Sequence, residues 1–137
     1  MITITNDAPA TFPLGTTVVT WTATDASGNT STCTQTVIVK DATQPTISCA
    51  GNINQGTSAG SCDASVATPD PTIADNCGTG GLTLTWAMTG ATTATSPATG
   101  INNVGTKTFN VGVTTITYTV KDAAGNTSTC SSNTTNR

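Results

Sequence analysis

The sequence predicts an all-β sandwich that is repeated along the chain. Residues 12–33 (FPLGTTVVTWTATDASGNTSTC) return at 109–130 (FNVGVTTITYTVKDAAGNTSTC), with 13 of 22 positions identical and a constant offset of 97. An offset near 100 residues is the length of one small β-sandwich domain. Apolar residues alternate with threonine, and Gly and Pro interrupt these runs, which indicates strands separated by turns.

The repeat divides the chain into one partial and one nearly complete copy. Residues 1–40 correspond to the C-terminal part of a domain, and residues 41–137 form a nearly complete domain. The partial copy lacks the opening strands that would cover its apolar face, so we expect it to be completed by preceding polypeptide or, in trans, by a neighbouring subunit. Residues 131–137 lack the apolar residues found at 34–40, which predicts a weak or altered last strand.

Strands are expected where apolar residues alternate with threonine, because successive side chains of a strand point to opposite faces. One face of each strand is then apolar and the other is polar. No stretch shows the period of an amphipathic helix. The predicted inward-facing residues are Val19, Trp21, Ala23, Cys33, Val37, Val39, Leu82, Leu84, Trp86, Met88, Ile116, Tyr118 and Val120.

Two short segments between alternating runs are predicted to be hairpin turns. They are Asp25–Asn29 (DASGN) and Asp122–Asn126 (DAAGN). Gly28 and Gly125 are expected to adopt positive φ there, where a residue without a Cβ is least strained. The aspartate that opens each turn can accept hydrogen bonds from the backbone N–H groups that follow it.

The composition excludes several classes of function. The chain has no His and no Glu, four Lys and Arg together, and seven Asp, so general acid–base catalysis has few candidate groups. Charged residues make up 8% of the chain, against about 25% in soluble domains, and this profile suits an extracellular β-protein. The net charge of −3 and the scattered cations argue against nucleic-acid partners. Those cations are Lys40, Lys107, Lys121 and Arg137.

No segment of the sequence is predicted to enter a membrane. No run approaches the roughly 20 apolar residues of a membrane-spanning helix. The first residues also lack the basic start and apolar stretch of a signal peptide, so we expect any export signal to lie outside this sequence.

No catalytic residues are predicted. A cysteine nucleophile requires a base, and the chain has no histidine to supply it. The aspartates lie in turn contexts and not in apolar segments of the kind that create acid–base pairs. Glycan binding usually requires exposed aromatic residues. Trp21, Trp86 and Tyr118, however, lie at alternating strand positions that are predicted to face the core. Phe12 and Phe109 are interpreted as packing residues.

The spaced motifs of the nearly complete copy resemble the hyalin repeat, or HYR, domain. In chain order these motifs are DATQPTISC (41–49), GSC (60–62), ADNC (74–77), VGVTTITY (111–118) and DAAGNTSTC (122–130). The resemblance implies an immunoglobulin-like sandwich of the kind found in tandem in extracellular and cell-surface proteins associated with adhesion. It implies no catalytic activity. Two features depart from the family pattern: Ala50 stands where Pro usually follows the cysteine, and residues 86–108 are rich in Thr, Ala and Gly.

Five cysteines predict an oxidised framework outside the cytosol. Spacing alone leaves three pairings open among the four in residues 41–137. The immunoglobulin-like arrangement that the resemblance implies favours Cys49–Cys130 together with Cys62–Cys77. Cys33 is the repeat equivalent of Cys130, so its partner is expected outside the chain or on a neighbouring subunit. Zinc binding is not expected, because the chain has neither a histidine nor a Cys-x2-Cys pair.

A candidate calcium site is predicted at one end of the sandwich. In an immunoglobulin-like topology the start of the first strand, the loop between the second and third strands, and the last hairpin lie at the same end. Carboxylate and amide oxygens are suitable calcium ligands. The residues gathered there are Asp41, Asp75, Asn76, Asp122 and Asn126, with Asp25 and Asn29 as a weaker equivalent pair in the first copy. The alternative is that each side chain only stabilises a turn, and no cofactor is otherwise required.

Together, the repeat, the composition and the resemblance predict an extracellular structural or adhesive repeat protein. Self-association is expected, because an open partial domain with an odd cysteine invites completion by a neighbour, and a head-to-tail contact that does not close builds a filament. Adjacent repeats and a cell-surface or matrix protein are the expected partners. The alternative is a ligand-binding adhesin module that recognises a glycan or another protein through its loops.

Overall fold

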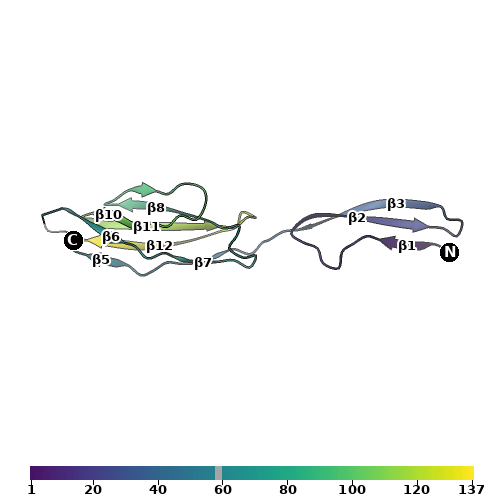
Figure 1. Cartoon of the computed structure of the whole chain (residues 1–137), viewed down its shortest axis with the longest axis horizontal. Helices are drawn as coiled ribbons and strands as arrows, with labels where there is room; N and C mark the ends of the chain where they lie inside the picture. The colour runs from purple at the N-terminus through teal and green to yellow at the C-terminus, as the bar shows by residue number, and fades with distance from the viewer. Residues whose placement is uncertain (58–59) are drawn as a thin grey trace. The chain divides into compact units, whose positions relative to one another are not determined.

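The structure, a computed structural model, is built from β-strands throughout the part of the chain that it describes, residues 1–57 and 60–137 (Figure 1). It forms two compact units, Met1–Asp41 and Ala42–Arg137, called unit 1 and unit 2 below. The predicted all-β class is therefore confirmed.

Unit 1 is a three-stranded antiparallel sheet in the order β1-β2-β3. Its strands are β1 (Thr3–Asn6), β2 (Gly15–Thr24) and β3 (Thr30–Val39). The alternation of apolar residues and threonine extends the chain into strands, and the predicted turn at Asp25–Asn29 reverses it between β2 and β3. Gly28 lies in this turn with a φ of 85°, as predicted.

Unit 2 contains a five-stranded sheet in the order β5-β12-β11-β8-β9. Its strands are β5 (Ile53–Gln55), β12 (Thr127–Asn136), β11 (Gly112–Lys121), β8 (Thr83–Gly90) and β9 (Ala94–Thr95). Neighbouring strands are antiparallel except for β5 and β12, which are parallel. The predicted second turn joins β11 to β12, and Gly125 has a φ of 97° there.

Two smaller strand pairs complete unit 2 as a sandwich. They are β4 (Thr46–Ser48) with β7 (Thr72–Ala74), and β6 (Asp63–Ala67) with β10 (Thr106–Asn110). Their apolar side chains pack with those of β8 and β11 in one core. The buried core residues are Ala64, Val66, Leu82, Leu84, Trp86, Met88, Val104, Phe109, Ile116, Tyr118 and Val120.

The last strand of unit 2 is fully formed, so the prediction of a weak strand at residues 131–137 was wrong. β12 pairs with β11 along ten residues, from Thr127 opposite Lys121 to Asn136 opposite Gly112. Asn136 is buried, and its Nδ2 donates to the Phe109 carbonyl at 2.7 Å. A hydrogen-bonded polar side chain therefore occupies a core position that the sequence comparison expected to be apolar.

Strand register shows which parts of unit 2 have counterparts in unit 1. Thr3 of β1 lies opposite Thr24, and Thr83 of β8 lies opposite Lys121, the repeat equivalent of Thr24. Unit 1 therefore contains counterparts of β8, β11 and β12. The strands β4 to β7 have no counterpart among its three strands.

Candidate functional site

One face of the unit 1 sheet forms an apolar groove of about 530 Å³. Three of the residues that line it, Trp21, Ala23 and Cys33, are positions that the alternation predicted to face inward. The residues that line it are Ile4, Trp21, Thr22, Ala23, Ser31, Thr32, Cys33, Thr34 and Gln35. Trp21 lies opposite Cys33, and its indole Nε1 donates to Gln35 Oε1 at 3.2 Å. We call this surface the open face.

The alternation of apolar residues did not identify six of the lining residues, among them Ile4 and Gln35. Ile4 lies between two threonines in β1, and this alternation is itself a strand signal. Gln35 shares the parity of Cys33 in β3, but a polar residue gives no signal in a search for apolar positions.

Equivalent residues of the two units differ strongly in burial. Tyr118 and Val120 are buried in unit 2, whereas their equivalents Trp21 and Ala23 are only half-buried. Phe109 is completely buried, but its equivalent Phe12 is half-buried. At these positions the same strand pattern makes a core in unit 2 and an accessible surface in unit 1, whereas Val19 is buried as predicted, like its equivalent Ile116.

The strands that unit 1 lacks are the ones that cover this face in unit 2. Ile47 of β4 and Ile73 of β7 pack against the core, together with the buried Ala64 and Val66 of β6. At the edge, Ser128 Oγ of β12 donates to the Pro45 carbonyl at 2.6 Å. The missing strands account for the exposure of the open face.

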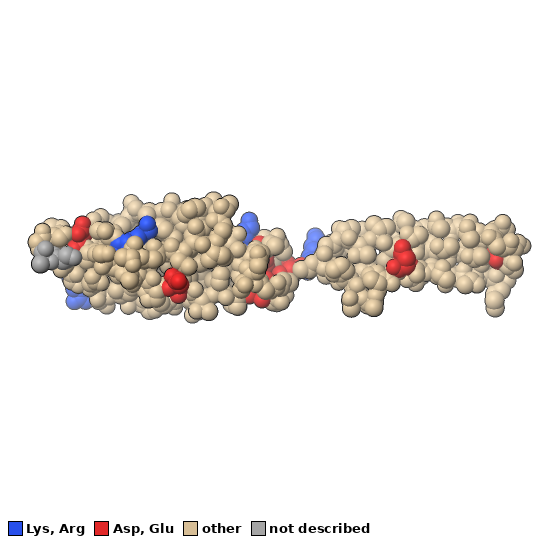
Figure 2. All heavy atoms as spheres, viewed as in Figure 1, with Lys and Arg blue, Asp and Glu red and all other residues tan. Residues whose placement is uncertain are grey.

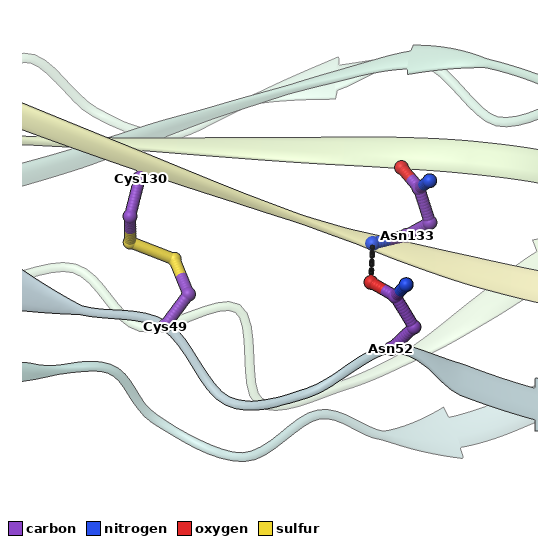
Figure 3. The surroundings of a disulfide bond; sticks show 4 residues. All are labelled: Cys49, Asn52, Cys130 and Asn133. Carbon is purple, nitrogen blue, oxygen red and sulfur yellow. Dashed lines mark hydrogen bonds between the residues drawn. A yellow bond between two sulfur atoms is a disulfide. The ribbon is translucent and has the colours of Figure 1, made fainter.

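A disulfide joins Cys49, which follows β4, to Cys130 of β12 (Figure 3). The two Cα atoms are 5.8 Å apart, within the range that a disulfide spans. Nearby, the backbone N–H of Asn133 donates to Asn52 Oδ1 at 2.9 Å, as Figure 3 shows. The structure thus forms the first of the two expected pairs and connects residues 81 positions apart.

The second expected pair, Cys62–Cys77, does not form, because the two residues lie at opposite ends of the sandwich. The carbonyl of Cys62 accepts a hydrogen bond from Val111, next to the start of β11. Cys77 follows β7, which pairs with β4. Pro45, just before β4, is hydrogen-bonded to Ser128, and Ser128 lies near the start of β12. These are opposite ends of a ten-residue hairpin, roughly 30 Å apart, whereas a disulfide requires Cα atoms within about 7 Å.

Cys33, the fifth cysteine, lies on the open face of unit 1 with its thiol exposed. It occupies the register position of Cys130, opposite Trp21 as Cys130 is opposite Tyr118. No other described cysteine belongs to unit 1. Its partner outside unit 1 remains a prediction.

Both Asp-Asn turns hold their aspartate in the same network. Asp122 Oδ1 accepts from the Asn126 backbone at 2.8 Å, and Oδ2 accepts from Asn126 Nδ2 at 2.9 Å. Asp25 and Asn29 repeat this arrangement at 2.9 and 3.0 Å. These contacts give both aspartates the turn-stabilising role that was the alternative to calcium binding.

The predicted calcium ligands are only partly brought together. Within unit 2, both carboxylate oxygens of Asp122 accept hydrogen bonds from Asn126, and Asn76 is exposed. Asp75 accepts from a backbone N–H through Oδ2, whereas its buried Oδ1 has no hydrogen-bond partner. Asp41 is the last residue of unit 1. Calcium takes six to eight oxygen ligands, so backbone carbonyls or water would have to supply most of them here.

Acid is expected to destabilise unit 2 through Asp122. Burial acts to raise the pKa of this carboxyl, but hydrogen bonds from the Asn126 side chain and from the turn backbone hold the pKa below its usual value. A carboxyl whose pKa is lower in the folded state stabilises that state above its unfolded pKa and loses the contribution as pH falls through the folded value. The free energy of unfolding of unit 2, measured in urea, should therefore fall below about pH 4. The substitution Asp122→Asn should flatten this pH dependence. An unchanged pH dependence in the variant would contradict the assignment.

Charged side chains are sparse on the surface. Figure 2 shows uncharged residues covering most of the visible face of each unit, with individual blue and red side chains among them. The open face is lined entirely by uncharged residues. In the described part of the chain, no helix is long and apolar enough to cross a membrane.

Comparisons with known proteins give consistent matches along the chain. The sequence is 36% identical over 129 residues to hyalin from Strongylocentrotus purpuratus, covering 92% of this chain and 9% of that protein. It is 36% identical over 132 residues to hyalin from Lytechinus variegatus, covering 94% of this chain and 22% of that protein. The chain thus spans less than a quarter of the length of these relatives.

A solved structure and a family model also match the chain. A solved protocadherin gammaB7 EC3-6 cis-dimer structure aligns with 99% of this chain and 41% of its own, with a TM-score of 0.41 and 12% identity. The sequence model of the HYR domain matches residues 1–39 and again residues 40–135. These two matches cover both units and include the motifs that form the hairpins and the disulfide, so the chain belongs to the HYR domain family.

Proposed function

We propose that the chain is an extracellular structural and adhesive repeat module whose units join head to tail into a cell-surface filament by strand complementation. The observation that carries this proposal is the open face, an apolar groove where unit 2 buries the equivalent surface under β4, β6 and β7. Membership of the HYR family and the Cys49–Cys130 disulfide support a location outside the cytosol. Adjacent repeats and a cell-surface or matrix protein are the proposed partners.

The donor strands must come from a neighbouring HYR repeat. Each strand described in unit 2 already pairs within that unit. A segment equivalent to residues 41–81, which holds β4 to β7, would supply what unit 1 lacks. Strand addition gains main-chain hydrogen bonds at the sheet edge and buries alternate side chains in the groove.

Adding a second copy of the donor segment at either end of the chain tests this proposal. A second copy of residues 41–81 is added after Arg137. Arg137 is the repeat equivalent of Lys40, so the added segment follows it as Asp41 follows Lys40 in the sequence. Light scattering and electron microscopy should then show regular polymers, because each tail fills unit 1 of the next molecule. In the control, the same copy precedes Ile2, the register equivalent of Leu82, and should close unit 1 within one molecule. A chain that stays monomeric with the segment after Arg137, as the control does, would contradict assembly by complementation.

The same polymers test the predicted calcium site. Because Asp122 and Asn126 are engaged in their turn, we propose that assembly requires no metal and expect the polymers to survive a chelator. Dissociation on chelation, restored by added calcium, would instead support a site that includes Asp75. Reduction reports separately on covalent links through cysteine.

A ligand-binding adhesin module is the second candidate function. The observation that favours it is Trp21, which is half-buried in the groove instead of enclosed in a core, and lies beside the amide of Gln35. An accessible aromatic ring beside a polar amide can bind a sugar or a protein side chain. Binding to a glycan array that is lost in Trp21→Ala, in a chain that never polymerises, would favour this candidate.

A further inference from the structure

We propose that the open face selects an incoming segment of the pattern Pro-x-Ile-x-Cys and bonds it covalently through Cys33. The pattern is that of residues 45–49, which form the first strand of unit 2 and its cysteine. This inference rests on the strand complementation proposed above and identifies the segment that fills the groove.

Two anchor points in unit 2 define how such a segment lies. Ser128 Oγ donates to the Pro45 carbonyl at 2.6 Å, and Cys130 is bonded to Cys49. The anchors are two residues apart in β12 and four residues apart in the segment. Ile47 lies midway between the anchored residues and packs against the core.

Unit 1 carries both anchors unchanged. Ser31 and Cys33 are the repeat equivalents of Ser128 and Cys130, and both line the groove. Ser31 lies opposite Ala23, and Cys33 lies opposite Trp21, in the register of the corresponding pairs of unit 2. A serine hydroxyl and a thiol therefore stand at the spacing that holds Pro45 and Cys49 in the neighbouring unit.

The groove also suits this segment in polarity. Its floor is formed by Trp21 and Ala23, with Ile4 on the neighbouring strand, and none of its lining residues is charged. The segment Gln44–Cys49 is likewise uncharged, and it presents one branched apolar side chain, Ile47, between its anchors. Burial of that side chain on the apolar floor gives the groove a basis for selection.

The covalent step is a thiol–disulfide exchange. The thiolate of Cys33 attacks the sulfur of an activated segment cysteine, a new disulfide forms, and the leaving thiol departs with the electron pair of the broken bond. When both cysteines start as thiols, a disulfide such as oxidised glutathione accepts the two electrons and two protons and becomes two thiols.

A peptide with the sequence of residues 42–51 (ATQPTISCAG) tests the proposal on the full chain. Its cysteine is first converted to a mixed disulfide with thionitrobenzoate, whose release is followed by absorbance, and peptide mapping identifies the modified cysteine. Cys33 should capture this peptide about tenfold faster than a matched peptide with Ile47→Ser, the ratio expected for burial of one isoleucine. Cys62, exposed in the other unit, serves as the internal control and should not distinguish the two peptides.

Chain variants separate the two anchors. Cys33→Ser should abolish selective capture, and Ser31→Ala should reduce its rate while leaving the reaction of Cys62 unchanged. Equal capture of both peptides at Cys33, or equal modification of Cys33 and Cys62, would overturn the proposal.

The peptide result is independent of the assembly result. Selective capture by a chain that fails to polymerise when extended after Arg137 would support the segment assignment and contradict the filament. Polymers formed by a chain without selective capture would support the filament and overturn the assignment of this segment.

Discussion

Phe109→Ala is expected to lower the free energy of unfolding of unit 2 by about 3–5 kcal/mol, the cost of removing a large buried side chain and leaving a cavity. Phe109 is completely buried at the end of β10. Its carbonyl also accepts the hydrogen bond from the buried Asn136, so a shift of this backbone would disturb a polar core contact. Urea unfolding monitored by circular dichroism measures the loss.

The repeat supplies a matched control for this substitution. Phe12 occupies the equivalent position in unit 1, where it is only half-buried because the strand that would cover it is missing. Phe12→Ala should therefore cost less than about 1 kcal/mol, as substitutions away from a packed core usually do. Equal losses at the two positions would show that unit 1 already has a closed core, contrary to the structure.

Removal of the Cys49–Cys130 disulfide is expected to have an effect of similar size. The bond connects residues 81 positions apart. Closing a loop of that length lowers the conformational entropy of the unfolded chain, which destabilises the unfolded state by about 4 kcal/mol. The double substitution Cys49→Ser, Cys130→Ser should lower the free energy of unfolding of unit 2 by about this amount. Unfolding in urea under non-reducing conditions provides the measurement.

Cys33→Ser is the matched control for the disulfide. Its thiol is exposed and occupies the position of Cys130 without a bonded partner in unit 1. We expect its stability effect to stay within about 0.5 kcal/mol, as for most surface substitutions. A loss as large as that of the double variant would contradict the difference between the units.

Much of the sandwich could be predicted from local sequence. Alternation of apolar residues with threonine identifies the inward faces of β8 and β11, and Leu84, Trp86, Ile116, Tyr118 and Val120 are all buried as expected. The Asp-x-x-Gly-Asn turns were predictable because glycine and aspartate have specific roles in tight turns. These signals are short-range, and they do not depend on which strands become neighbours.

The features that sequence failed to predict depend on long-range packing. The predicted pairing of Cys62 with Cys77 was wrong, because local sequence does not show which end of the sandwich each residue reaches. The last strand looked weak because a hydrogen-bonded Asn136 replaces an apolar residue in the core. Trp21 has core parity, yet it is half-buried because strands outside unit 1 decide whether that face becomes a core.

We propose that the open face of unit 1 is a binding surface for the strands of another HYR segment. Amide hydrogen exchange along β2 and β3 tests it most directly, measured in the chain alone and with a second copy of residues 41–81 placed before Ile2. Protection of β2 and β3 in the extended chain should rise to the level of their equivalents β11 and β12. Unchanged exchange in β2 and β3, while β11 and β12 stay protected, would contradict the claim.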